Sequence, residues 1–210
     1  MPLDLFPLKT VLFPRMRLPL HIFEPRYRAM IHHCLEHDER FGIVLIEHGE
    51  EVGGPATPHS VGTTARVTNV ELRDDGSLDI VAAGERRFRI ESIVQTEPHL
   101  KAEVSLSVLA VRDPSAVATL GPEVRAAFRR ALELMLALKS GYSANLDLPH
   151  DPEDLAFLIG AGLLVDDSTR QQLLEAESLD DLLDRERDLI AEHIEALEHR
   201  LTERLQSRRN

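Results

Sequence analysis

Histidines and the chain's one cysteine gather in residues 18–46, which raises the question of a metal or catalytic site. His33 and His37 are four residues apart, a spacing that places two side chains on one face of a helix. Zinc needs three or four ligands, however, and no HExxH pattern accompanies the pair. Cys34 lies inside the same predicted helix rather than at its start, where a thiolate would be stabilised. The sequence therefore favours a structural helix over a metal centre.

Other segments that resemble catalytic motifs each lack a necessary part. Residues 141–145, GYSAN, resemble the Gly-x-Ser-x-Gly turn of serine hydrolases but lack the second glycine and a preceding strand. Lys139 and Ser140 are adjacent in a predicted helix, so their side chains point in different directions. No GxxxxGKS/T phosphate loop and no GxGxxG motif occurs in the chain. We expect no catalytic residue, no cofactor and no metal ligand, and hence a protein that is not an enzyme.

The remaining candidates for a binding surface are charged or aromatic: Glu24, Arg26, Tyr27, Arg86 and Arg87. In a regularly alternating strand over GERRFRI, Arg87 and Arg89 face solvent, and Arg86 shares the buried face of Phe88 and Ile90. A buried arginine needs a partner, because an unpaired buried charge is costly, and Glu24 or a backbone carbonyl could supply one. A structural role for that arginine is the simpler interpretation.

Composition limits the classes of function. The 210 residues carry a formal net charge of −12, which disfavours nucleic acid and anionic membranes as partners. A single cysteine excludes an internal disulfide and suits a reducing compartment. The start of the chain does not resemble a signal peptide, and its most apolar run is far shorter than the roughly 20 residues of a membrane-spanning helix. We therefore expect a cytoplasmic protein.

Residues 1–111 read mostly as strands. Prolines interrupt the apolar runs LDLFPL and MRLPL, as is typical of edge or barrel strands. The run FGIVLI, at 41–46, has the composition of a buried strand. The run TARVTNVELR, at 64–73, places Val70 and Leu72 at apolar strand positions after an irregularity.

Turn and helix signals separate these strands. Asp75-Gly76 predicts a tight hairpin turn, and Gly84 predicts a bulge or a close backbone approach. Residues 102–111 alternate, with Val104, Leu106 and Val108 on one face. One helix, about 25–38, is entered through Glu24-Pro25. The pattern predicts a small α+β domain over 1–111.

Residues 112–210 read as helices, and they carry more of the acidic excess: 11 Lys and Arg against 20 Asp and Glu in 113–210. After a linker and helix entry over 113–120 we expect helices over 121–141, 150–162, 166–178 and 178–205. The first would begin at Pro122 and end at Gly141, and the second has Asp151 as its N-cap. Ser178 with Asp181 resembles a capping box for the last helix. This half is predicted to be a helical bundle.

The strand-rich half also resembles a known family. The segments LDLFPLKTVLFPRMRLPLHIFEPRYRAMIHHCL, FGIVLI and VGTTARVTNVELRDDGSLDIVAAGERRFRI are similar, in order and spacing, to the N-terminal substrate-binding domain of the Lon protease family. The resemblance implies a PUA-like β pseudo-barrel with one inserted helix, followed by an α-helical bundle. It also implies packing of Phe23 and Tyr27 against that helix. Arg15 stands where the family often has glycine, so this turn could differ locally.

The family likeness implies a stand-alone binding module without the ATPase and protease domains of Lon. Such a module would bind polypeptide segments or a protein partner, in a groove between barrel and bundle. Two other classes remain open: a nucleic-acid-binding PUA-like protein, if Arg66, Arg86, Arg87 and Arg89 formed one exposed surface, and a small-molecule enzyme with an unrecognised site. A homodimer through the long C-terminal helix could also form.

Overall fold

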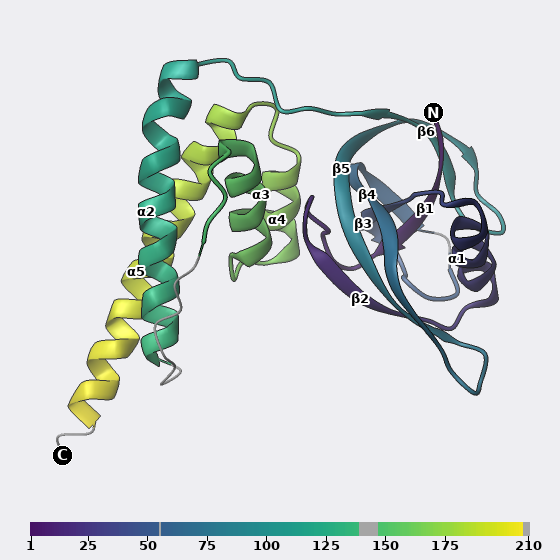
Figure 1. The fold of residues 1–210 in the computed structure, drawn as a ribbon, viewed down its shortest axis with the longest axis horizontal. Helices are drawn as coiled ribbons and strands as arrows, with labels where there is room; N and C mark the ends of the chain where they lie inside the picture. Colours follow the sequence, from purple (N-terminus) through teal and green to yellow (C-terminus); the bar gives the residue numbers. More distant parts are fainter. Residues whose placement is uncertain (55, 139–146, 208–210) are drawn as a thin grey trace. The chain divides into compact units, whose positions relative to one another are not determined.

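The computed structural model describes residues 1–54, 56–138 and 147–207 of the chain (Figure 1). Contacts divide the protein into two compact units. The strand unit comprises Met1–Val108 and Leu164–Glu175, and the helical unit comprises Leu109–Leu163 and Ala176–Asn210. None of the described helices combines the length and apolar character needed to cross a membrane.

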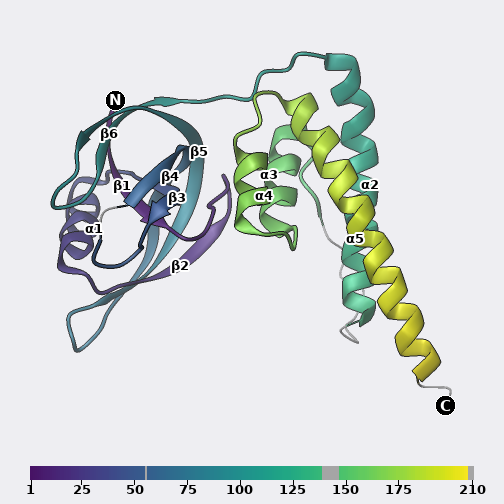
Figure 2. The ribbon, with the colours of Figure 1, turned by 180° about the vertical axis from the view of Figure 1, so that it is seen from behind.

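Six strands and one helix follow one another in the strand unit: β1 (Pro2–Leu8), β2 (Arg17–Ile22), α1 (Pro25–His37), β3 (Phe41–Gly49), β4 (Ala56–Leu72), β5 (Leu78–Gln95) and β6 (Lys101–Leu106). The sheet order is β2-β5-β4-β3-β1-β6, and β5 also pairs with β6, so that five strands close into a ring (Figure 2). Among the six strands of the described chain, β1 and β3 pair in parallel and the other pairs are antiparallel. Strand β2 is added outside the ring, on β5. The predicted α+β class and pseudo-barrel are thus confirmed.

Helix α1 closes one side of the main core of this unit. Its Tyr27, Met30, Ile31 and Cys34 are buried and belong to the same cluster as Phe41 and the inward residues of β2 and β5. The spacing of the four residues is that of one apolar helix face. Asp38 ends the helix in a left-handed conformation, and its N–H bonds the Cys34 carbonyl.

Two glycines behave as the sequence predicts. Gly76 has a φ of 79° in the turn between β4 and β5, a conformation that favours glycine. A Cβ on Gly84 would lie 2.3 Å from the Phe13 carbonyl oxygen, so the chain passes too closely for any side chain. The hydrogen bond from Arg15 N to Gly84 O fixes this approach at 2.8 Å.

Strand β6 differs from its prediction. It ends at Leu106, so Val108 lies beyond it, and both residues are exposed. Of the three residues expected on one buried face, Val104 alone is buried.

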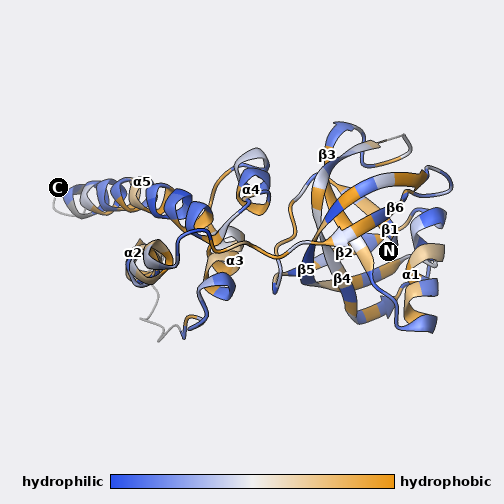
Figure 3. Ribbon diagram, turned by 90° about the horizontal axis from the view of Figure 1, so that it is seen from above, coloured by the Kyte–Doolittle hydropathy of each residue, from blue (hydrophilic) through white to orange (hydrophobic). Residues whose placement is uncertain are grey.

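The helical unit contains α2 (Pro114–Leu138), α3 (Pro152–Gly162) and α5 (Leu179–Ser207). Helices α2 and α5 run side by side in Figures 1 and 2. Asp151 caps α3 by accepting from the Asp154 N–H, and Ser178 accepts from the Asp181 N–H, so both predicted caps are confirmed. Polar residues recur along α5 in Figure 3, as expected of a helix that buries one apolar stripe.

The prediction for the start of α2 is wrong. The helix begins at Pro114 rather than at Pro122, which lies inside it, and no linker separates it from residue 113. Asp113 caps it by accepting from the Ser115 and Ala116 N–H groups. Gly141, Lys139, Ser140 and the GYSAN segment lie outside the described residues.

Helix α4 (Asp167–Leu174) groups with the strands, although the sequence placed it with the other helices. The buried Gln171 side chain donates from Nε2 to the Val61 carbonyl of β4 at 3.0 Å. The same Nε2 lies 2.7 Å from Glu175 Oε1, and Glu175 Oε1 lies 3.2 Å from His59 Nδ1 of β4. These polar contacts join α4 to the strand unit.

Candidate functional site

The residues predicted at the entry to α1 form a compact charged and aromatic cluster. Arg26 and Glu24 are paired at 2.9 Å, and the Arg26 guanidinium lies 4.6 Å from the centre of the Tyr27 ring. The Tyr27 ring in turn lies 4.2 Å from that of Phe6 in β1, and burial raises the pKa of its phenol. This cluster holds the first turn of α1 against the sheet.

Phe23 is not packed against α1 as the family likeness implied. Its side chain is 50% exposed. It stacks on His21 of β2, with ring centres 5.9 Å apart, and His21 Nδ1 lies 2.7 Å from Asp79 Oδ1 of β5. The prediction for Phe23 is therefore wrong, and this ring belongs to the surface beside β2 and β5.

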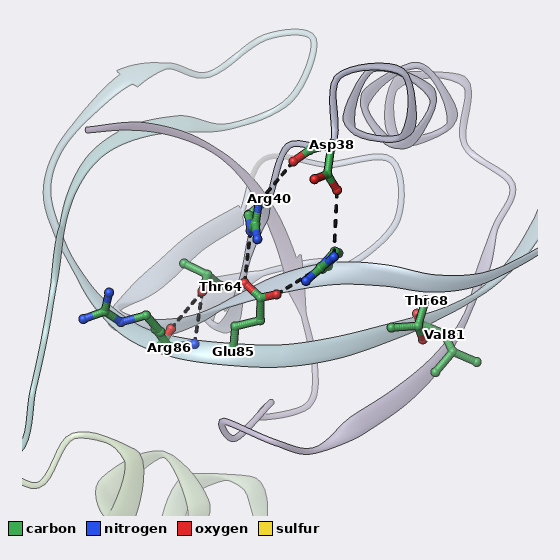
Figure 4. Close-up of polar contacts among 8 residues, drawn as sticks. Asp38, Arg40, Thr64, Thr68, Val81, Glu85 and Arg86 are labelled. Atoms are coloured by element: carbon green, nitrogen blue, oxygen red, sulfur yellow. Dashed lines mark hydrogen bonds and ion pairs between the residues drawn. The ribbon is translucent and has the colours of Figure 1, made fainter.

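The two arginines of the GERRFRI strand have exchanged their predicted roles. Arg87 is only 3% exposed, whereas Arg86 is exposed. Arg87 and Phe88 are consecutive positions on opposite faces of β5 and both are buried, so both faces of the strand are covered here. A bulge precedes them: Thr63 pairs with Arg87 and Ala65 with Gly84, so Glu85 and Arg86 both stand opposite Thr64. Thr64 Oγ1 fixes the bulge by accepting from the Arg86 N–H and donating to its carbonyl (Figure 4).

Next to the bulge, charges of both signs neutralise one another. Arg40 and Arg66 each donate from Nε to a different oxygen of Glu85, at 3.1 Å (Figure 4). Burial alone would raise the pKa of Glu85, but these two guanidinium groups lower it. In Figure 4 the Arg86 side chain points away from Glu85. The four arginines of the predicted basic surface therefore do not form one exposed patch, because Arg87 is buried and Arg66 is paired.

The histidine pair on α1 does not gather further ligands. The His33 and His37 rings lie 4.3 Å apart, and His37 Nδ1 contacts the backbone carbonyl of His33. Within the described parts of the chain, no three His, Cys, Asp or Glu side chains are grouped as a metal site would need. Burial raises the pKa of Cys34 to about 11, which keeps it a thiol rather than a nucleophilic thiolate.

Apolar side chains gather on a different part of the strand unit, which we call the hairpin arm, residues 66–81. It consists of the end of β4, the turn at Gly76 and the start of β5, and it projects from the ring in Figures 1 and 2. Val70 and Leu72 are 45% and 68% exposed here. The sequence predicts that both residues occupy apolar strand positions, but it does not reveal that their side chains are exposed.

A groove of about 550 Å³ lies beside these residues, on the β2-β5-β4 sheet. Its lining includes Pro19 and His21 of β2, Val81 of β5, and Asn69 and Glu71 of β4. The arm is also acidic, with Glu71, Asp74, Asp75 and Asp79 against Arg66, which is paired with Glu85, and Arg73, which is paired with Asp79. These lining positions alternate with Val70 and Leu72 along β4, so the groove lies on the sheet face opposite to the side chains of Val70 and Leu72. The arm therefore offers an apolar strip on one face and a groove with acidic residues on the other.

Strand lengths explain why this surface exists and give a signal that sequence reasoning missed. Strands β4 and β5 have 17 and 18 residues, whereas β3 has nine. The last residue of β4 that pairs with β3 is Ala65, so the end of β4 extends beyond its neighbour. When one strand is longer than its neighbour in the sheet, its extra residues have no strand beside them, and apolar residues among them are exposed.

The comparisons with known proteins agree with this architecture. The family described as the ATP-dependent protease La (LON) substrate-binding domain matches residues 2–192. Lon protease 2 of Myxococcus xanthus is 30% identical over 202 residues, and the Lon protease of Anaeromyxobacter dehalogenans (strain 2CP-C) is 29% identical over 198 residues. Each match covers 90% of this chain and 24% of the relative, so the chain spans about a quarter of the length of these curated relatives.

Solved structures share the fold. The N-terminal domain of the Mycobacterium avium complex Lon protease has a TM-score of 0.69 at 23% identity, with 92% of this chain and 100% of that chain covered. The Lon N-terminal domain protein from Xanthomonas campestris has a TM-score of 0.62 at 24% identity, with 88% and 96% covered. The resemblance seen in the sequence is confirmed, and the match across residues 2–192 shows that this chain belongs to the LON substrate-binding domain family.

Proposed function

We propose that this protein is a non-catalytic module that binds polypeptide segments through the hairpin arm and the groove beside it. The observation that carries the proposal is the exposure of Val70 and Leu72, at 45% and 68%, at the end of β4 that extends beyond β3. Exposed apolar side chains that lie close together are typical of interaction surfaces. Membership of a family of substrate-binding domains supports the same conclusion.

The chemistry of the arm supports a polypeptide as the ligand rather than a small polar molecule. Aliphatic side chains and an open groove suit the aliphatic side chains of a flexible chain. The carboxylates of Glu71, Asp74 and Asp75 suit basic residues in the same segment. Helix α1 would contribute indirectly, since Arg28 donates to the Gly76 carbonyl at 2.8 Å and so links α1 to the turn of the arm.

A catalytic role has less support. The thiol of Cys34 is buried and its pKa is raised, and the described residues show no metal-binding group. A nucleic-acid-binding role would need the exposed surface of four arginines, a condition that the burial of Arg87 and the pairing of Arg66 leave unmet. Binding without catalysis is therefore the function that we propose.

The test is fluorescence anisotropy of a labelled, permanently unfolded polypeptide titrated with the whole chain, with the folded form of the same polypeptide as control. We expect micromolar binding of the unfolded form alone. Leu72→Ser should weaken it, because the substitution removes the most exposed apolar side chain of the arm. Val108→Ser is the matched control, since Val108 is 67% exposed but lies outside the arm.

Absence of binding at high protein concentration would contradict the proposal. Equal loss of binding in Leu72→Ser and Val108→Ser would show that general apolar exposure, and not the arm, is responsible. Binding of the folded control as strongly as the unfolded form would also contradict it.

A further inference from the structure

The outer side of the hairpin arm is an open strand edge. Strand β3 pairs with β4 only from Ala56 to Ala65, and in the described chain no strand pairs with residues 66–72 on that side. On its other side the same segment pairs with β5 as far as Leu72 and Leu78. The end of β4 is therefore an edge strand with one row of backbone groups facing away from the sheet.

Two hydrogen bonds fix which residues present those groups. Arg73 N donates to Ser77 O, which makes Arg73 and Ser77 a hydrogen-bonded pair of the antiparallel ladder. Such pairs alternate, so Glu71 bonds Asp79 and the backbone groups of Val70 and Leu72 point outward. The hydrogen bond from Gly84 N to Met16 O agrees with this assignment. It shows that the even-numbered residues at the start of β5 direct their backbone groups to β2, and hence that Asp79 directs its groups to β4.

The residues at this edge are thus the same two that expose apolar side chains. Val70 and Leu72 each present an N–H, a carbonyl and an exposed aliphatic side chain at one strip of surface. Their side chains share a face with Ile80 and Leu78, which are buried core residues. A strand added here would extend that apolar face.

The opposite edge of the same three strands is protected. By the same alternation, Leu18, Leu20 and Ile22 direct their backbone groups to β5, and Arg17, Pro19 and His21 present theirs to the open side. Pro19 has no N–H, and proline at such a position prevents strand addition. Thr68 makes a bulge next to the β4 edge, but Val70 and Leu72 lie beyond it.

We propose that an extended polypeptide segment binds by adding a strand to the β4 edge at Val70 and Leu72. Residues of that segment opposite Val70 and Leu72 would be apolar, because they share the face of these side chains. Residues at the alternate positions would be basic, because they lie beside Glu71 and near Asp74 and Asp75. The inference rests on the proposed function and specifies how the arm would recognise its ligand.

The first test uses a labelled peptide of about eight residues that alternates valine with lysine, since this length fits one strand. It is compared with the same sequence in which the valine nitrogens are methylated. The whole chain should bind the unmodified peptide, and each methyl group should weaken binding about fivefold, because it removes one backbone hydrogen bond. Equal binding of both peptides would overturn strand addition while leaving polypeptide binding by the arm in place.

The second test uses two variants of one residue. Val70→Pro removes the outward N–H but keeps an apolar side chain, and β2 already tolerates proline at the equivalent edge position, Pro19. Val70→Thr keeps the N–H and the shape of the side chain. We expect Val70→Pro to lose peptide binding, with an unchanged melting transition, and Val70→Thr to retain most of it. The reverse order would overturn the proposal in favour of side-chain contact alone.

A second copy of this chain is the competing occupant of the same edge. Light scattering over a range of protein concentrations distinguishes the two. The proposal would be overturned if the natural chain formed a dimer that Val70→Pro abolished and if the valine–lysine peptide did not dissociate that dimer. A protein that stays monomeric and binds the peptide would support it.

Discussion

Arg15 has a strained backbone: its φ is 66°, in the left-handed region that residues other than glycine disfavour. It occupies this conformation because its N–H bonds the Gly84 carbonyl where the two segments pass most closely. We predict that Arg15→Gly is more stable than Arg15→Ala by about 1 kcal/mol, since both variants lose the same side chain and only glycine relieves the backbone. Chemical denaturation of the two variants measures the difference.

Gly84 provides the control of opposite sign. Gly84→Ala places a Cβ within 2.3 Å of the Phe13 carbonyl oxygen, so the variant should unfold at lower denaturant concentration than the natural chain. If Arg15→Ala matched or exceeded Arg15→Gly in stability, the backbone at Arg15 would not be strained, and the family preference for glycine would need another reason.

The outcome for other residues shows which features a sequence can reveal. The caps at Asp151 and Ser178 and the turn at Gly76 depend on neighbours within three residues, and all were predictable. The burial of Arg87 was not, because Arg87 lies on the face of β5 opposite to the buried Phe88, and both faces are covered at this point. Whether the second face of a strand is covered depends on segments elsewhere in the chain.

Among the elements, α4 should depend on one buried side chain. Gln171 donates to the Val61 carbonyl of β4 and to Glu175, and its removal takes a donor away from the carbonyl of the buried Val61. We predict that Gln171→Ala lowers the free energy of unfolding by about 1–3 kcal/mol. Hydrogen exchange should show faster exchange of the α4 amides, since the strand hydrogen bonds of the ring remain.

The neighbouring Gln172 is exposed on the same helix and serves as the control. Gln172→Ala should change the free energy of unfolding by less than about 0.5 kcal/mol. Equal exchange rates of the α4 amides in the two variants would mean that apolar contacts, rather than the Gln171 hydrogen bonds, hold this helix.

Local signals are weaker guides to which elements pack together. The sequence indicates a helix near α4 but not that it joins the strands, because its contact with Val61 spans 110 residues of chain. Pro122 gives the same local signal at the first turn of a helix as inside one, so the start of α2 was placed too late. The uncovered arm likewise depends on the relative lengths of β3 and β4, which no single segment contains.

Over the whole molecule, carboxylates set the dependence of stability on pH in two opposite ways. Hydrogen bonds from Arg73 and His21 lower the pKa of Asp79, and the Thr169 backbone N–H lowers that of Asp166. Groups of this kind stabilise the fold above their unfolded pKa, and the stability is lost as the pH falls through the folded pKa. These carboxylates therefore lower the stability of the fold as the solution becomes acidic.

Glu186 in α5 has the opposite effect, because it lowers the stability of the fold as the pH rises. Its side chain is 0% exposed, and burial raises its pKa well above the usual range; the Gly160 N–H opposes this only in part and lies outside hydrogen-bond geometry. The contribution of Glu186 to stability is therefore greatest below its unfolded pKa and falls, by up to about 1.4 kcal/mol per pH unit, as the pH rises towards the folded pKa. We predict that Glu186→Gln raises the melting temperature far more at about pH 8 than at about pH 5, because each pH unit above the unfolded pKa further favours the ionised unfolded carboxyl over the buried protonated one.

The exposed Glu192 of the same helix is the matched control, and Glu192→Gln should leave the pH dependence unchanged. Thermal unfolding of the three proteins across this pH range separates a charge effect from a packing effect. A constant difference between Glu186→Gln and the natural chain at every pH would mean that Glu186 has the same pKa folded and unfolded. In that case a partner would have to stabilise its charge inside the helical unit, since an unpaired carboxylate is not tolerated at a fully buried position.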